Sequence, residues 1–351
     1  MNLQTLLGIE LPIIQAPMAG VQGSALAIAV CEAGALGSLP CAMLMPETMR
    51  SELATIAAHT QRPYNANFFC HAPPHADAAR EAAWRALLAP YYRELGLDIA
   101  AIAAAPTRTP FDAATADLLE TFKPPVLSFH FGLPQPDLLA RVRSWGSKIL
   151  ASATTVDEAR WLEARGVDAI IAQGLEAGGH RGHFLSDDLT LQSGLFALLP
   201  QIVQAVDVPV VAAGGIVDAH GVAAAIALGA AGAQVGTAYL LCPESTTGAA
   251  HRAALKDASR HTALTNLFSG RPARGIVNRV MRELGALNAT TPEFPLAAAA
   301  MAPLRARAER DGRGDFSPLW SGQNARACRE IPAGKLTREL AALLRPSNPS
   351  A

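Results

Sequence analysis

Three stretches near the middle of the chain share nearly the same pattern and decide the fold: EARGVDAIIAQG at residues 163–174, VQAVDVPVVAAGG at residues 203–215 and ALGAAGAQVGT at residues 227–237. Each reads as the end of a helix, a short turn, a buried strand and a loop that contains glycine. Strands of a parallel sheet have continuous apolar runs, because helices cover both faces of the sheet. The three stretches therefore predict successive strand, loop and helix units of one parallel sheet.

The same pattern extends through most of the chain. The runs expected to form strands are Ile13-Ile14, Ala35-Leu36, Asn65–Phe69, Val126–Phe129, Ile149–Ala151, Ala169–Ala172, Val208–Ala212 and Ala233–Val235. The helices expected between them include Ser24–Ala33, Thr155–Arg165, Leu195–Val206 and Ala219–Leu228, with Thr155 and Asp218 as N-caps and Gly34, Gly166 and Gly229 after helix ends. Eight strands with right-handed crossovers predict an α/β fold, a (β/α)8 TIM barrel. A doubly wound open sheet is the alternative, but the regular pattern gives no sign of the reversal of strand order that it needs.

Two segments interrupt this regular pattern. Residues 72–123 are expected to be an insertion of helices, and the chain after residue 240 is rich in proline and short alanine-rich stretches. An amphipathic segment at residues 324–345 is expected to return as the last barrel helix. We therefore predict two domains: a TIM barrel made of residues 1–238 plus 322–351, and a smaller helical lobe, residues 239–321, that covers its mouth.

Composition excludes several classes of protein. Lysine and arginine total 29 and aspartate and glutamate total 30, so no excess positive charge is available for a general nucleic-acid-binding surface. The five cysteines include no CxxC pair, which argues against a disulfide framework and a structural zinc site. Proline, glutamine and glycine break the uncharged stretch 11–31, and no lysine or arginine precedes Arg50, so neither a membrane span nor a signal peptide is predicted. We expect a cytoplasmic protein; a homodimer is one assembly that the sequence allows.

Glycines follow the last two predicted barrel strands, at Gly214-Gly215 and within Gln234–Thr237. Loops after the seventh and eighth strands commonly hold phosphate in TIM barrels, and glycine lets the backbone N–H groups approach an anion. The alternative is that these glycines only permit tight turns. The two loops together favour a phosphate site.

Two histidines, His130 and His180, directly follow predicted strands and should lie at the barrel mouth. There an imidazole can donate a hydrogen bond or carry charge near neutral pH, so both are candidate catalytic residues. The alternative is that each is an ordinary polar residue. His180 and His183 lack a nearby carboxylate cluster and lie on a glycine-rich loop, so no metal site is predicted.

Several motifs resemble those of the nitronate monooxygenases, formerly called nitropropane dioxygenases, and in particular their bacterial class one. They are PIIQAPMAG at residues 12–20, NANFF at 65–69, SFHFG at 128–132, AQGLEAGGHRG at 172–182, AAGGI at 212–216, QVGTAYL at 234–240, SGRPARGIVN at 269–278 and LWSGQ at 319–323. The segment AGGHRG, with AAGGI and QVGT behind it, is specific to this superfamily.

The resemblance implies FMN across the barrel mouth, with Asn67 and Gln173 at the ring system or its ribityl chain. The residues that it implies for FMN binding are Ala16, Pro17, Met18, Asn67, Gln173, Gly178, Gly179, Gly214, Gly215, Gln234, Val235, Gly236 and Thr237. His130 and His180 are implied as the catalytic residues. The implied reaction is oxidation of an alkyl nitronate, such as propionate 3-nitronate, by O2 to a carbonyl compound and nitrite or nitrate.

The chain departs from class one in one respect. Several tyrosines and a lysine line the class one pocket, whereas this chain has four tyrosines, and residues 301–313 offer Arg305, Arg307 and Arg310. The resemblance therefore implies flavin binding more firmly than substrate choice. Two alternatives stay open: an NAD(P)H-dependent FMN reductase of quinones or enoyl thioesters on the same scaffold, and a flavin-binding barrel without turnover.

Overall fold

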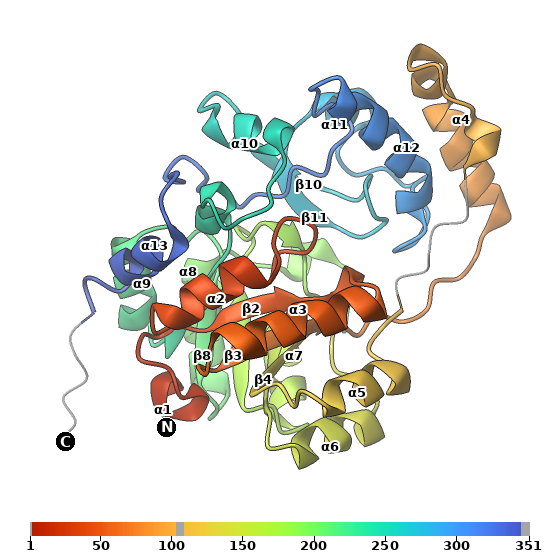
Figure 1. The fold of residues 1–351 in the computed structure, drawn as a ribbon. Coiled ribbons are helices and arrows are strands. Elements are labelled where there is room, and N and C mark those ends of the chain that lie inside the picture. The colour runs from red at the N-terminus through yellow and green to blue at the C-terminus, as the bar shows by residue number, and fades with distance from the viewer. Residues whose placement is uncertain (1, 103–108, 345–351) are drawn as a thin grey trace.

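The computed structural model describes residues 2–102 and 109–344, and its centre is a barrel of eight parallel strands (Figure 1). The strands are β1 (Ile13–Gln15), β2 (Gly37–Pro40), β3 (Tyr64–Phe69), β4 (Val126–His130), β5 (Lys148–Ala153), β6 (Ala169–Gln173), β8 (Val210–Ala213) and β9 (Gly232–Val235). Their order in the sheet is β1-β9-β8-β6-β5-β4-β3-β2, so strands adjacent in the sequence are adjacent in the sheet.

The two ends of this sheet meet. A parallel bridge joins Ile14 to Leu36, and the Leu36 N–H donates to the Ile13 carbonyl oxygen at 3.0 Å. The bridge closes the barrel, which confirms the predicted TIM barrel and excludes the open sheet. The second strand begins two residues later than predicted, because the chain leaves the left-handed turn at Gly34 (φ +90°) and uses Leu36 only for this bridge.

Helices surround the barrel and cover its outer face. They are α2 (Ser24–Glu32), α3 (Pro46–His59), α5 (Ala113–Glu120), α6 (Pro136–Ser144), α7 (Val156–Glu163), α8 (Leu195–Ala205), α9 (Ala219–Ala227) and α13 (Ala333–Leu340), and α1 (Leu3–Leu7) lies at the amino-terminal end of the strands. Short 3₁₀ turns are η1 (Cys41–Met43), η3 (Leu189–Leu191) and η4 (Thr237–Leu241), and a further one, η2 (Ile99–Ala101), packs against α4 (Ala78–Glu94). The Thr155 side chain accepts the Glu158 N–H, and the Asp218 side chain accepts the Gly221 N–H, so both predicted N-caps are confirmed.

The last helix returns to the barrel as expected. It is shorter than the predicted segment 324–345, and it packs against α2 and α9. The last seven residues of the chain lie outside the described residues.

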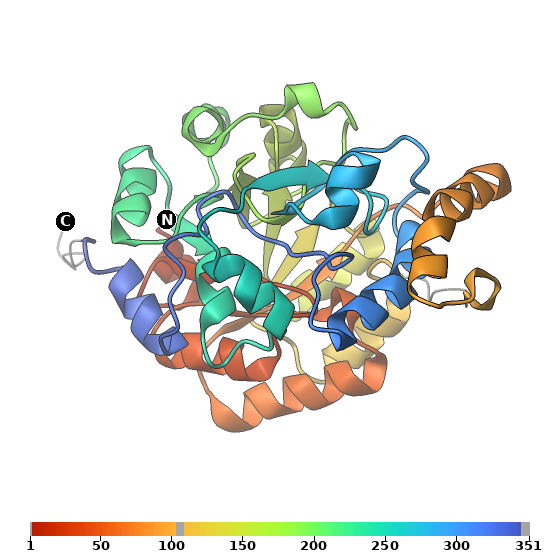
Figure 2. The same ribbon diagram turned by 90° about the horizontal axis from the view of Figure 1, so that it is seen from above.

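A second group of elements covers the barrel mouth. It contains α10 (Ala249–Lys256), β10 (Thr262–Thr265), β11 (Ala273–Ile276), α11 (Arg279–Leu284) and α12 (Ala297–Arg310), together with α4 (Ala78–Glu94) from the insertion (Figures 1 and 2). We call this group the outer lobe. It is not purely helical as predicted, because β10 and β11 form an antiparallel sheet with β7 (Gly179–His180). This sheet is separate from the barrel sheet, and the domain boundaries stay a prediction.

The insertion helix α4 belongs to the outer lobe because it shares a hydrophobic core with α12. Trp84 and Tyr92 of α4 are almost fully buried in one cluster with Leu304 and Phe316. The Tyr92 hydroxyl donates to the Ala300 carbonyl oxygen at 2.7 Å.

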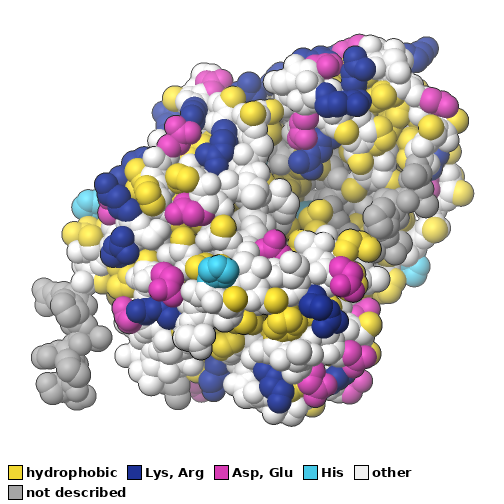
Figure 3. Space-filling view, viewed as in Figure 1, with side chains coloured by type: hydrophobic (Ala, Val, Ile, Leu, Met, Phe, Trp, Pro, Cys, Tyr) yellow, Lys and Arg dark blue, Asp and Glu magenta, His cyan; other side chains and the backbone are white. Residues whose placement is uncertain are grey.

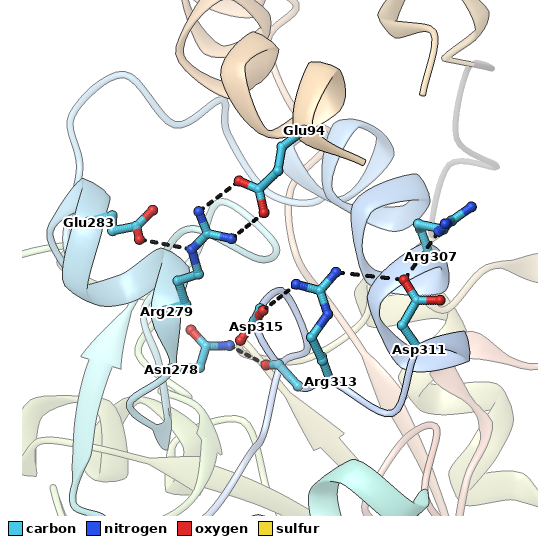
Figure 4. Close-up of polar contacts among 9 residues, drawn as sticks. Glu94, Asn278, Arg279, Glu283, Arg307, Asp311, Arg313 and Asp315 are labelled. Carbon is cyan, nitrogen blue, oxygen red and sulfur yellow. Dashed lines mark hydrogen bonds and ion pairs between the residues drawn. The ribbon is translucent and has the colours of Figure 1, made fainter. Parts of the chain in front are cut away.

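Ion pairs at the surface also join elements of the outer lobe. Figure 4 shows Arg279 between Glu94 and Glu283, and its guanidinium donates to both carboxylate oxygens of Glu94 at 2.6 and 2.8 Å. Arg313 lies between Asp311 and Asp315 in the segment that follows α12. The Arg279–Glu94 pair connects α11 to α4, whereas the Arg313 pairs lie within residues 311–315.

Charges are mixed on the molecular surface. On the face drawn in Figure 3, basic and acidic side chains are interspersed. Within residues 2–102 and 109–344, no helix has the length and apolar character needed to cross a bilayer.

Candidate active site

A cavity of about 650 Å³ lies at the carboxyl ends of the barrel strands, beneath the outer lobe. All the predicted site residues except Val235 line it. Val235 is 1% exposed and its side chain packs in the main core, so only its backbone is placed near the site. The sequence therefore predicted one wall of this cavity, the wall formed by the barrel loops.

The two glycine loops form one end of the cavity. Gly214 and Gly215 have φ values of +125° and +71°, which residues other than glycine rarely adopt. A Cβ atom on Gly214 would lie 3.1 Å from the Ala177 nitrogen, and one on Gly215 would lie 3.3 Å from the Glu176 Cβ. Glycine is thus required for the turn itself, which lines the cavity and leads into α9.

A segment that sequence reasoning did not assign to the site lies against both loops. The Gly322 N–H donates to the Thr237 hydroxyl at 2.9 Å, and the Asn324 amide donates to the Gly215 carbonyl oxygen at 3.2 Å. A Cβ atom on Gly178 would lie 2.5 Å from the Gly322 nitrogen, so Gly178 permits this close crossing. We call residues 321–324 the crossing segment; the motif LWSGQ contains its first three residues and was the available signal.

Three of the side-chain amides that line the cavity, those of Asn67, Gln173 and Gln234, differ in how many hydrogen bonds the protein makes to them. The Asn67 amide nitrogen donates to the Ser128 carbonyl oxygen at 3.1 Å and to the Ser128 hydroxyl at 2.9 Å. Gln173 donates to the His180 carbonyl oxygen at 3.0 Å and accepts the Gly182 N–H at 2.8 Å. The buried Gln234 Oε1 has no hydrogen-bond partner among the described residues. Such an acceptor is costly to leave unpaired, which points to a ligand donor at this position.

His130 is held by the protein through both ring nitrogens. Its Nδ1 lies 3.1 Å from the Ser152 hydroxyl, and its Nε2 lies 3.2 Å from the His180 carbonyl oxygen. Burial lowers the pKa of His130 to about 3, the hydrogen bond to His180 opposes this shift, and Arg271 and Arg181 add to it. His130 is therefore neutral at physiological pH.

His180 lies in an aromatic enclosure on the cavity wall. Its ring centroid is 5.4 Å from that of Phe294, 5.5 Å from that of Trp320 and 6.2 Å from that of Phe69. Its Nε2 lies 2.8 Å from the Ser269 hydroxyl. Phe294, Trp320 and Ser269 come from the outer lobe and were not assigned to the site from the sequence. The motifs SGRPARGIVN and LWSGQ contain Ser269 and Trp320 and were the available signal for these two residues, whereas Phe294 had none.

A buried cation lies below the same loop. Arg181 is fully buried and donates to the Gln192 side chain at 2.6 Å and to the carbonyl oxygens of Gly174 and Gln173 at 2.7 and 2.8 Å. Burial lowers its pKa to about 10, so the guanidinium stays charged at neutral pH. All three hydrogen-bond acceptors are neutral, and the carboxylates of Glu176 and Glu158 also interact favourably with the charge.

The comparisons with known proteins agree with this geometry. A family model described as nitronate monooxygenase matches residues 1–342. The chain belongs to the nitronate monooxygenase family. It is 44% identical over 340 residues to the nitronate monooxygenase of Paraburkholderia phytofirmans, covering 95% of this chain and 92% of the relative. It is 42% identical over 349 residues to that of Pseudomonas aeruginosa, covering 97% of this chain and 98% of the relative.

Solved structures show the same scaffold. A nitroalkane oxidase from Streptomyces ansochromogenes matches with a TM-score of 0.89 and 41% identity over 97% of each chain. FabK from Thermotoga maritima matches with a TM-score of 0.72 and 26% identity, over 97% of this chain and 94% of that one. The predicted nitronate monooxygenase resemblance is thus confirmed at the level of the family, and membership makes this chain an oxidoreductase.

Proposed function

We propose that this chain catalyses the FMN-dependent oxidation of alkyl nitronates, such as propionate 3-nitronate, by O2 to a carbonyl compound and nitrite or nitrate. The observation that carries the proposal is the position of His180 on the wall of a 650 Å³ cavity, in a chain of the nitronate monooxygenase family. The nitronate monooxygenases of P. phytofirmans and P. aeruginosa supply the substrate class.

The residues present fit FMN. The turn at Gly214-Gly215 and the loop at Gly236-Thr237 would hold the phosphate through backbone N–H groups, and the unpaired Gln234 Oε1 would accept a hydrogen bond from the ring system or ribityl chain. Ala16, Pro17 and Met18 line the cavity beside Gly236 and would pack against the cofactor. Bound FMN would accept electrons from the nitronate and pass them to O2.

The chain's own residues bind and enclose the anion. A nitronate is already deprotonated, so the His180 side chain is required to bind and orient its oxygens rather than to remove a proton. Phe69, Phe294 and Trp320 surround the imidazole and exclude water, which strengthens every charge interaction inside the cavity.

The test uses purified protein loaded with FMN. Propionate 3-nitronate in air should yield nitrite or nitrate, and anaerobic nitronate should bleach the flavin absorbance. Oxidation of NADH or NADPH with a quinone or an enoyl thioester, without nitronate oxidation, would favour the reductase alternative. Flavin binding with neither reaction would favour a barrel without turnover. The cytoplasmic location and the homodimer stay predictions; size-exclusion chromatography with light scattering tests the assembly.

A further inference from the structure

The two nitrogens of His130 define its tautomer. A carbonyl oxygen can only accept a hydrogen bond, so the contact between His130 Nε2 and the His180 carbonyl oxygen at 3.2 Å requires a proton on Nε2. The pKa of His130 is far below neutral, so Nδ1 carries no proton and accepts from the Ser152 hydroxyl at 3.1 Å. Neither nitrogen is left for a substrate in this arrangement.

Packing fixes the ring in the same place. A Cβ atom on Gly182 would lie 2.8 Å from His130 Cε1 and 3.2 Å from Ser152 Cβ, so the glycine lets the ring and the serine lie directly against the loop that carries His180. The next residue, Phe131, has a φ of +69°, which is costly for an aromatic residue. The Arg271 guanidinium carbon lies 4.3 Å from the centroid of the Phe131 ring, so this ring is packed against a cation.

We propose that His130 and Ser152 are positioning residues: Ser152 fixes the Nε2-protonated tautomer of His130, and His130 fixes the backbone carbonyl of His180. The His180 imidazole is then the group of this pair that contacts the nitronate. Gln173 donates to the same carbonyl oxygen at 3.0 Å, so two side chains from β4 and β6 hold β7 in place. His130 thus acts on the reaction through His180.

The charges that face His130 favour this role over that of a base. Burial opposes its protonation most strongly, Arg271, Arg181 and His183 oppose it further, and the hydrogen bond to the His180 carbonyl oxygen favours it. A general base needs a pKa near the working pH, and His130 does not have one. A neutral donor of fixed direction suits the role of holding a carbonyl group.

The first test does not depend on activity. In protein labelled with ¹⁵N-histidine, the His130 resonances, assigned with the His130→Gln variant, should show a neutral Nε2–H tautomer that does not titrate between pH 5 and 8. Ser152→Ala should shift the Nδ1 resonance, whereas Ser147→Ala, which removes another buried serine hydroxyl immediately before β5, should not. An Nδ1–H tautomer or a titration in this range would overturn the proposal.

The second test separates positioning from base catalysis. The amide nitrogen of glutamine can take the place of Nε2, whereas that of asparagine takes the place of Nδ1. His130→Gln should therefore keep kcat/KM for nitronate within about threefold, and His130→Asn should lower it about tenfold, the value of one good hydrogen bond. If His130 removed a proton, both variants would lose about 10²–10⁴-fold with the neutral nitroalkane, and the proposal would fail.

The kinetic test rests on the proposed function, whereas the NMR test does not. A wild-type protein without nitronate oxidation that still shows the fixed tautomer would reject the proposed function and keep the positioning pair. Nitronate oxidation combined with a titrating His130 would do the reverse.

Discussion

His130 Nε2 lies 3.2 Å from the carbonyl oxygen of His180. This contact joins β4 of the barrel to β7 of the outer-lobe sheet, and Gln173 donates to the same oxygen from β6. The backbone beneath the His180 imidazole is therefore fixed by two barrel side chains at once. A substitution that moves β4 or β6 is therefore expected to move the His180 backbone through this carbonyl group.

Replacing Gly215 by valine should give folded protein that does not retain FMN. The turn proposed to hold the phosphate needs a left-handed backbone conformation at this position, which valine rarely adopts. Gly96→Val is the matched control, since Gly96 has φ +65° on the exposed end of α4. Both variants should lose about 1–2 kcal/mol of stability from the strained backbone. Flavin content is read from absorbance, and full retention in Gly215→Val would reject the phosphate site.

Thr237→Val should loosen the crossing segment, because the Gly322 N–H loses its acceptor at 2.9 Å. We expect a loss of about 1–3 kcal/mol in unfolding free energy and weaker FMN binding. Thr237→Ser keeps the hydroxyl and should behave as wild type in denaturant titration and in FMN titration. Equal behaviour of the two variants would show that the hydrogen bond does not hold the segment.

His180→Asn should lower kcat/KM for nitronate by about tenfold, through loss of one hydrogen bond to the bound anion. His220→Asn, at an exposed position on α9, is the control. Assays with the nitronate and with its neutral nitroalkane, at equal flavin content, check this prediction. A loss of about 10²–10⁴-fold confined to the nitroalkane would instead show that His180 removes a proton.

Stability should fall as the pH drops from 7 to 5. Burial lowers the pKa of His251 and of His183 to about 4, below the ordinary value of 6.5, so below pH 6.5 the unfolded chain binds protons that the native protein does not. Each such histidine destabilises the native state by up to about 2 kcal/mol at pH 5 relative to pH 7. His251→Gln keeps a donor for the Trp320 carbonyl oxygen and should reduce the pH dependence by about one proton. The unfolding free energy is measured by denaturant titration at several pH values between 5 and 7. If it changed with pH equally in the wild type and in His251→Gln, the low pKa assigned to His251 would be wrong.

The barrel and its loops could be predicted from the sequence because their signals are local. Apolar runs mark the strands, Thr155 and Asp218 mark helix starts, and Gly214-Gly215 marks a turn. The outer lobe could not be predicted in the same way. Its strands β10 and β11 have four residues each and no clear alternation, so the segment was expected to be helical.

The candidate site divides in the same manner. The residues at the carboxyl ends of the barrel strands and in the loops after them were predicted and do line the cavity, with Val235 as the exception because its side chain packs in the core. Ser269, Phe294 and Trp320 reach His180 only through the tertiary fold. Arg181 lies in the motif AGGHRG, but its burial depends on acceptors from Gln192 and two backbone carbonyl groups, which the motif does not reveal.

The pairing of β7 with β11 has a consequence for engineering and for evolution. Because Ala273 pairs with His180, the barrel loop that carries this histidine forms part of the outer-lobe sheet. A chimera that exchanged residues 239–321 between two family members would replace β11, the strand that pairs with His180. It would also replace the outer-lobe side chains that line the cavity. An exchange of the outer lobe between family members should therefore require matched changes in the loop after β6. We expect residues 239–321 and this loop to change together in evolution.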